Sequence, residues 1–239
     1  MPFRYFVPKA LAVSAISLLI AGQSIDARAF DMGSIAADLT HPSVSAVLED
    51  DHNILKHVSD ENGAGSGAQK FIDNMADQAL GFIANENMSK DQKAAKFKTL
   101  LESSFDMNTI ARFALGRYWR TATNEQKKEY LRLFKDMVVS VYSGRFDEYE
   151  GQKFETRSSR NDGDKDALVS SFVVPDKGSE IQIDWRVRHK NGKYQIVDVV
   201  VEGVSMSVTQ RSDFASVIQR GGGNVDVLLE HLRTQSSGE

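Results

Sequence analysis

The hydrophobic residues of this chain change their period after Gly151. In residues 68–146 they recur roughly every three or four positions, which is the spacing of amphipathic helices that bury one face. In residues 154–204 they alternate with polar residues, most strictly over residues 181–188, which is typical of strands with one wet face. The chain therefore has to fold as helices, then an antiparallel sheet, then helices again, which is the α+β class.

Local start and stop signals set the expected elements. Ser89 with Gln92 and Thr123 with Gln126 form capping boxes, and Asp106 is suited to cap a helix between them. We predict helices over residues 68–83, 89–101, 106–116, 123–146, 208–220 and 225–232, a short helix over 44–58, and strands over 154–160, 167–174, 181–188 and 194–204.

Turn residues join these strands into a sheet of neighbours. Residues 175–178 (Pro-Asp-Lys-Gly) form a strong turn sequence, and Asn191-Gly192 is a two-residue hairpin signal. One face of the sheet carries Ile183 and Trp185, which have to be shielded from water. The expected architecture is a helical layer packed on a four-stranded antiparallel sheet.

The N-terminus has the layout of a secretory signal peptide. Arg4 and Lys9 precede an uncharged run over residues 10–21, and small residues flank the expected cleavage point after Ala29. The run is shorter than the roughly 20 residues that a membrane-spanning helix needs. We expect a signal peptide over residues 1–29, an acidic flexible leader over residues 30–67 and one folded domain over residues 68–239.

The composition leaves little material for catalysis. The chain has no cysteine and no Gly-x-Ser-x-Gly motif, and His189 and His231 are the histidines of the expected domain. The glycine run 221–223 follows a helix rather than a strand, so it is not a phosphate loop. Residues 162–166 hold alternating acids but lack the glycine and the terminal glutamate that a calcium loop requires at fixed positions. We expect no catalytic residue, no metal site and no cofactor.

Charge and apolar content point away from nucleic acid. From Ala68 onward acidic and basic residues are equal in number, so no field would attract a nucleic acid. The apolar residues of the helices and the sheet could form either a filled core or a wall around a guest molecule, and periodicity does not distinguish the two. An enzyme for a small apolar substrate stays open as an alternative, with Asp184 or Asp198 as its ionisable group.

Several separated motifs occur in an order typical of one known family. They are Phe105-Asp106, the run Leu115-Gly116-Arg117-Tyr118-Trp119, Thr123 with Gln126, Asp184, Asp198, the run Glu202-Gly203-Val204-Ser205-Met206, Phe214 and residues 223–229. With these motifs, residues 68–235 resemble the MlaC or toluene-tolerance family of periplasmic phospholipid-binding proteins, which are auxiliary components of ABC transporters.

The resemblance implies a periplasmic lipid carrier. It implies a mixed helix and sheet fold around an apolar cavity that takes up phospholipid, and a monomer that is not an enzyme. It further implies that the carrier shuttles lipid between an outer-membrane lipoprotein–porin complex and an inner-membrane ABC transporter complex, which maintains outer-membrane asymmetry. Two alternatives stay open: a carrier of hopanoid or another polycyclic lipid, and a non-catalytic envelope adaptor with a filled core.

Bulk and expected inward orientation select the residues that would contact this lipid. The predicted lining is Phe105, Ile110, Phe113, Trp119, Val138, Tyr142, Ile183, Trp185, Val199 and Val201. Arg117, Arg188 and Ser205 are predicted to meet a headgroup phosphate at the mouth. The alternative for Arg117 is a structural ion pair with Asp198 or Glu202.

Overall fold

The structure, a computed structural model, describes residues 64–236. The expected signal peptide, nearly all of the expected leader and the expected helix over residues 44–58 lie outside these residues. Within the described range, no helix combines the length and the apolar composition that a membrane crossing requires.

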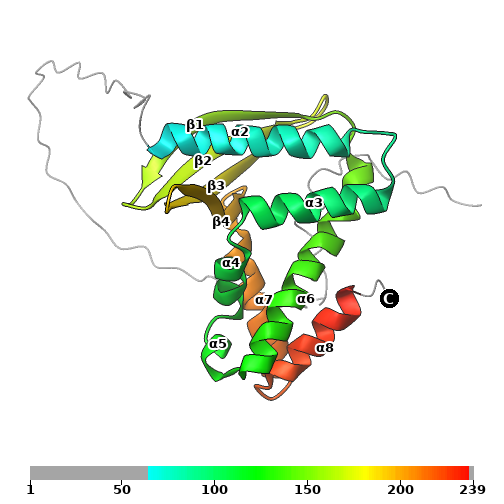
Figure 1. Cartoon of the computed structure of the whole chain (residues 1–239), viewed down its shortest axis with the longest axis vertical. Coiled ribbons are helices and arrows are strands. Elements are labelled where there is room, and N and C mark those ends of the chain that lie inside the picture. The colour runs from blue at the N-terminus through cyan, green and yellow to red at the C-terminus, as the bar shows by residue number, and fades with distance from the viewer. Residues whose placement is uncertain (1–63, 237–239) are drawn as a thin grey trace, which may run out of the picture. The chain divides into compact units, whose positions relative to one another are not determined.

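In the sequence, the strands of a single sheet lie between an N-terminal and a C-terminal group of helices (Figure 1). The helices are α2 (Ala64–Ile83), α3 (Lys90–Ser104), α4 (Met107–Leu115), α5 (Tyr118–Thr121), α6 (Asn124–Ser143), α7 (Met206–Arg220) and α8 (Val225–Ser236), with the 3-10 turn η1 (Phe146–Glu148) after α6. The strands are β1 (Lys153–Asp162), β2 (Asp166–Val174), β3 (Ile181–Lys190), β4 (Lys193–Val201) and β5 (Val204–Ser205). They pair in chain order, and every pair is antiparallel.

The sheet has five strands, so the expectation of four was wrong by one short strand. Glu202 and Gly203 both have positive φ, 49° and 78°, and form a tight turn that ends β4. Val204 then pairs with Val201 as the start of β5. Positive φ at both central residues is the geometry of a two-residue hairpin turn, which the Asn191-Gly192 turn between β3 and β4 also adopts as predicted.

The predicted helix caps are confirmed. Ser89 with Gln92 and Thr123 with Gln126 form reciprocal capping boxes at the starts of α3 and α6. The side chain of Asp106 accepts a hydrogen bond from the backbone N–H of the third residue of α4. These side chains satisfy backbone donors that have no partner within the helix.

Several helix boundaries differ from the predictions by a few residues, and the short helix α5 was not predicted. The helix α6 ends at Ser143, so Phe146 belongs to η1. The helix α2 begins at Ala64 and includes Gly67, which was expected in the flexible leader. A Cβ atom at Gly67 would collide with the ring of Tyr194, so the glycine lets the start of α2 approach the sheet closely.

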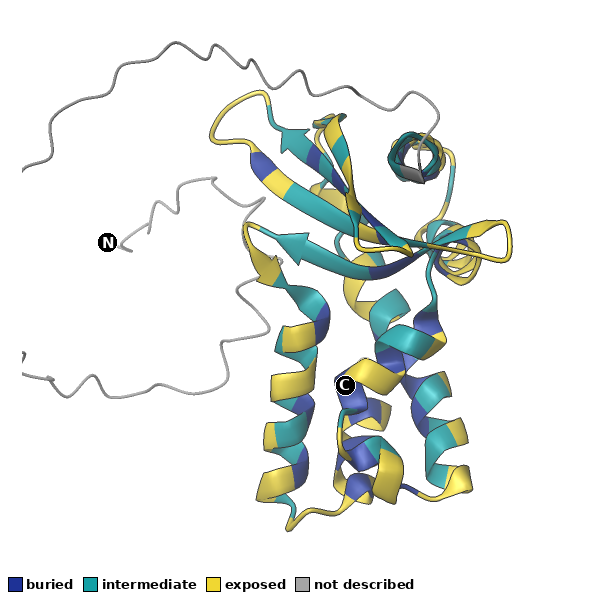
Figure 2. Ribbon diagram, turned by 90° about the vertical axis from the view of Figure 1, so that its left-hand side faces the viewer, coloured by how far each residue is buried: buried dark blue, intermediate teal, exposed yellow. Residues whose placement is uncertain are grey.

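Helices α2 and α3 cover one face of the sheet, which we call the inner face (Figures 1 and 2). At one end of this face Ala167, Val187 and Ile196 lie side by side on β2, β3 and β4 and are buried. Ala68 and Ile72 of α2 pack on them. This sheet core is one of two separate clusters of buried apolar residues.

The second cluster lies among α4, α6, α7 and α8, the helices that group beyond the sheet in Figure 2. Its centre includes Tyr130, Phe134 and Phe214, whose rings lie about 6 Å apart. Phe105 packs against both clusters and forms a bridge with Ile196 of β4. The helical core and the sheet core therefore meet at the chain segment between α3 and α4.

Candidate functional site

Four side chains form an incompletely covered apolar surface on the inner face of the sheet. Ile183 pairs with Val201, and Trp185 pairs with Val199, so the four lie together on β3 and β4. All four are half-buried, whereas Val187 on the same face is fully buried. We call this group the apolar face. Apolar area left partly in contact with water is unfavourable by about 25 cal/mol per Å², so this surface favours an apolar covering.

Hydrogen bonds fix the orientation of the indole ring in the apolar face. The Nε1–H of Trp185 donates to Oγ of Ser171 at 2.8 Å, and Oγ of Ser171 donates to the carbonyl of Ile183 at 3.0 Å. Phe154 packs its ring edge against the indole at 6.3 Å between centroids. Because the indole N–H is satisfied within the protein, the ring presents an apolar surface to anything that lies on it.

A row of polar groups crosses the inner face beside this indole. Thr156 of β1 lies opposite Ser171 of β2. Its hydroxyl accepts from Nε2 of Gln69 at 3.2 Å and donates to Oδ1 of Asp73 at 2.7 Å. These groups have partners and join α2 to the sheet. The sequence held a signal for this row, because Ser171 is a polar residue at an inward position between Val169 and Val173.

Aromatic rings lie where α3 and α6 approach the end of α2. The rings of Phe97 and Phe146 are 5.3 Å apart, and the rings of Phe82 and Phe146 are 6.0 Å apart. Tyr142 lies 6.5 Å from Phe97 and is 40% exposed. Tyr142, a predicted lining residue, therefore belongs to this aromatic cluster rather than to the apolar face of the sheet.

The other predicted lining residues fall into a different part of the molecule. Ile110, Trp119 and Val138 pack against the helical core. Phe113 is 41% exposed, and the guanidinium of Arg211 lies over its ring. The structure thus brings together the predicted residues of β3 and β4 and places Phe105 between the two cores. It puts Ile110, Trp119 and Val138 with the helical core and leaves Phe113 exposed.

The three predicted headgroup residues do not meet. Arg188 makes a bidentate ion pair with Asp166, in which Nε and Nη2 donate to the two carboxylate oxygens at 2.7 and 2.8 Å. This carboxylate raises the pKa of the Arg188 guanidinium. Ser205 donates its hydroxyl to Asp198 at 2.7 Å. Arg117 donates to the hydroxyl of Tyr118 at 2.8 Å, and within residues 64–236 it has no ion pair with Asp198 or Glu202. Each side chain has a separate local role.

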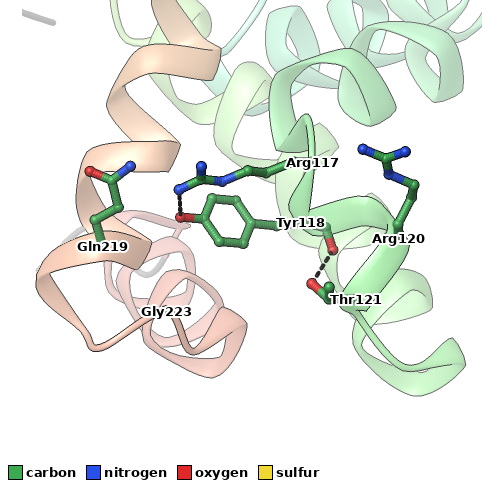
Figure 3. Close-up of a pocket in the computed structure, with 6 residues that line it drawn as sticks. All are labelled: Arg117, Tyr118, Arg120, Thr121, Gln219 and Gly223. Atoms are coloured by element: carbon green, nitrogen blue, oxygen red, sulfur yellow. Dashed lines mark hydrogen bonds between the residues drawn. The ribbon is translucent and has the colours of Figure 1, made fainter.

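A surface pocket of about 570 Å³ lies at the end of the helical part (Figure 3). It is lined by Arg117, Tyr118, Arg120, Thr121, Gln219 and Gly223. None of these residues belongs to the apolar face, so this pocket is not the enclosed lipid cavity that the family resemblance implies. Among the described residues, no three acidic or histidine side chains are placed to hold a metal ion together.

Asp198 joins the sheet to α7. Its carboxylate accepts from the hydroxyls of Ser205 and Ser207, both at 2.7 Å, and from the backbone N–H of Ser207 at 3.2 Å. Ser207 is buried and was not singled out by the sequence. Asp184, the other carboxylate considered for catalysis, accepts from the exposed side chain of Gln182.

We predict that Asp198→Ala lowers the free energy of unfolding by about 2–3 kcal/mol, because two serine hydroxyls and the backbone N–H groups of Val199 and Ser207 lose a charged acceptor. Urea unfolding followed by circular dichroism measures the change. Asp184→Ala is the control and should cost about 0.5 kcal/mol or less, since its bonds are exposed. Equal losses in the two variants would contradict this assignment.

Comparisons with known proteins show which family this chain belongs to. The family model described as MlaC protein matches residues 73–234. The toluene tolerance protein ttg2D of Pseudomonas putida is 25% identical over 114 residues, which are 48% of this chain and 53% of that protein. The intermembrane phospholipid transport system binding protein MlaC of Haemophilus influenzae is 22% identical over 127 residues, 52% of this chain and 58% of that protein. The matched segment thus spans little more than half the length of either relative.

A solved structure has the same fold. The phospholipid-binding protein of Ralstonia solanacearum, determined in complex with a phospholipid, superposes with a TM-score of 0.62 at 25% sequence identity. The match covers 72% of this chain and 97% of that protein. The family model covers more than half of the sequence, and the fold is shared. The chain therefore belongs to the MlaC family.

Proposed function

We propose that this chain is a periplasmic carrier of phospholipid that holds acyl chains against the apolar face of β3 and β4. The observation that carries the proposal is the group of half-buried side chains at Ile183, Trp185, Val199 and Val201, on a fold shared with a protein that was determined with phospholipid bound. The space for the chains would lie between the sheet and the covering helices α2 and α3.

The energetics of lipid transfer explain why such a carrier needs a sheltered apolar surface. Each methylene group removed from water contributes about 0.8 kcal/mol, so two membrane-length chains represent more than about 20 kcal/mol of unfavourable exposure. A bilayer shelters the same chains about as well. Loading and unloading are therefore nearly balanced exchanges, and the direction of transport has to come from partner complexes.

The cellular setting extends this proposal. The signal peptide over residues 1–29 would deliver the chain to the periplasm, with residues 30–67 as a leader and residues 68–239 as the lipid-binding domain. There the carrier would exchange phospholipid with an outer-membrane lipoprotein–porin complex and an inner-membrane ABC transporter complex, which maintains outer-membrane asymmetry. The names of the relatives support transport, because one is the binding protein of an intermembrane phospholipid transport system.

Analysis of co-purified lipid tests the proposal. Mature protein prepared without detergent should carry about one phospholipid per chain, as measured by native mass spectrometry and by extraction. A polycyclic lipid in its place would favour the hopanoid alternative. Folded protein that carries no lipid, and takes up none when it is refolded with phospholipid, would refute the carrier and favour an adaptor with a filled core.

A further inference from the structure

The arginines of residues 64–236 divide into two groups by their partners. Six form ion pairs with carboxylates: Arg132, Arg145, Arg157, Arg186, Arg188 and Arg233. Six have no ion pair within the described residues: Arg112, Arg117, Arg120, Arg160, Arg211 and Arg220. All of the second group except Arg160, which is on β1, come from α4, α5, α7 and the loop between α4 and α5. We call these five side chains the arginine face.

Contacts between neighbours connect the arginine face. The guanidinium of Arg211 on α7 lies 5.3 Å from the ring centroid of Phe113 on α4. Its Nε atom would lie only 2.9 Å from a Cβ atom at Gly116, which precedes Arg117 in the chain. Arg117 in turn extends toward Gln219, the neighbour of Arg220, across the pocket of Figure 3. One surface therefore runs from α4 to the end of α7.

The part of this surface near α6 is also positively charged. The guanidinium of Arg112 lies 5.2 Å from the ring centroid of Trp119, and the ammonium of Lys127 lies 5.7 Å from it. Arg120 follows Trp119 directly and is exposed. Aromatic rings favour cations over their faces and so hold these groups in place without neutralising them.

Almost no acid opposes these charges locally. Residues 107–123 and 204–223 together contain the five arginines, no lysine and a single acid, Asp213. One carboxylate oxygen of Asp213 is buried and has no hydrogen-bond partner. In a domain whose acids and bases are equal in number overall, this segregation leaves a locally positive surface that attracts anions.

The chemistry of the surface identifies its partner. A guanidinium presents paired N–H donors that match a carboxylate or a phosphate, whereas a bilayer surface attracts lysine and arginine alike. Three exposed apolar side chains accompany the arginines: Phe113 at 41%, Val204 at 47% and Val208 at 51% exposure. Exposed aromatic and apolar groups among side chains that are mostly arginine are typical of protein–protein interfaces. We propose that the arginine face docks a carboxylate-rich segment of a protein partner.

Charge reversal on the face tests this proposal directly. The probe is a fluorescein-labelled peptide that repeats Glu-Glu-Leu, titrated with the lipid-loaded protein and followed by fluorescence anisotropy at fixed salt. The double variant Arg117→Glu with Arg220→Glu should bind about 100-fold more weakly, at about tenfold for each lost pair. The matched control, Arg160→Glu with Lys193→Glu, makes the same change of charge at exposed sites on β1 and β4 and should bind within about twofold of wild type.

Two further measurements separate carboxylate recognition from general attraction. Arg117→Lys with Arg220→Lys keeps the charge but loses the paired donors, and should weaken binding by more than about threefold. A peptide with Gln in place of Glu should not bind. Equal loss in the control pair, full binding by the lysine variant, or binding of phosphatidylglycerol vesicles in place of the peptide would overturn the proposal. The lipid content of every variant should match wild type, so this test is independent of the proposed carrier function.

Discussion

An Ile183→Asp variant is expected to purify with less than about one tenth of the wild-type phospholipid. Ile183 lies in the apolar face beside Val201, and in the proposed carrier its side chain contacts the acyl chains. A carboxylate at this position would have to lose water or gain a proton before a chain could cover it, and either process is costly. Lipid extraction and quantification from detergent-free protein measures the loss.

The control for this variant is Val208→Asp. Val208 is 51% exposed and lies in the first turn of α7, where a carboxylate also interacts favourably with the helix dipole. This variant should keep its lipid. Circular dichroism has to show that both proteins are folded. If folded Ile183→Asp retains a wild-type amount of lipid, the acyl chains are not held on β3 and β4.

A Tyr130→Ala variant is expected to lose about 3–5 kcal/mol of the free energy of unfolding, the cost of removing a large ring from a packed core. Tyr130 is fully buried and lies 5.9 Å from the ring of Phe134 and 6.0 Å from that of Phe214. Its hydroxyl donates to the carbonyl of Ala111 at 2.8 Å, which joins α6 to α4. Urea unfolding measures the effect, and a loss below about 1 kcal/mol would contradict this packing.

The hydroxyl of Tyr130 also makes stability depend on alkaline pH. Burial raises the pKa of Tyr130 well above its ordinary value of 10.0. Above pH 10 the unfolded chain loses the phenol proton of Tyr130 while the folded chain keeps it. The unfolded state then binds fewer protons, so the free energy of unfolding falls as pH rises. Tyr130→Phe removes this component and the hydrogen bond, at a cost of about 1–2 kcal/mol near neutral pH. An unchanged alkaline slope in Tyr130→Phe would refute this origin.

Features that depend on adjacent residues were predictable from the sequence. The capping boxes at Ser89 and Thr123 and the Asn191-Gly192 turn each involve side chains within a few positions of one another, so the residues alone specify them. The strand β5 was missed because its turn places a glutamate, Glu202, at positive φ. That conformation is uncommon for residues other than glycine, asparagine and aspartate, so the signal was weak.

The candidate site was predictable only where alternation decides which way a side chain points. Period two in β3 and β4 placed Ile183 and Val201 on one face, and the register confirms that they are neighbours. Helical periodicity showed that Ile110 faces inward but not which of two cores it faces, because that depends on the packing of α4 against α7. The ion pair of Arg188 likewise depends on the register that sets it opposite Asp166.

The interior is divided into two clusters of buried apolar residues, with Phe105 in contact with both, and this division affects how the molecule can respond to a bound guest. A guest that entered beside the strands would strain the packing of one cluster and leave the other as dense as before. In the proposed carrier, lipid uptake would then change the packing of the sheet core, whereas a partner protein would bind the surface of the helical part. That surface would have the same shape with and without bound lipid.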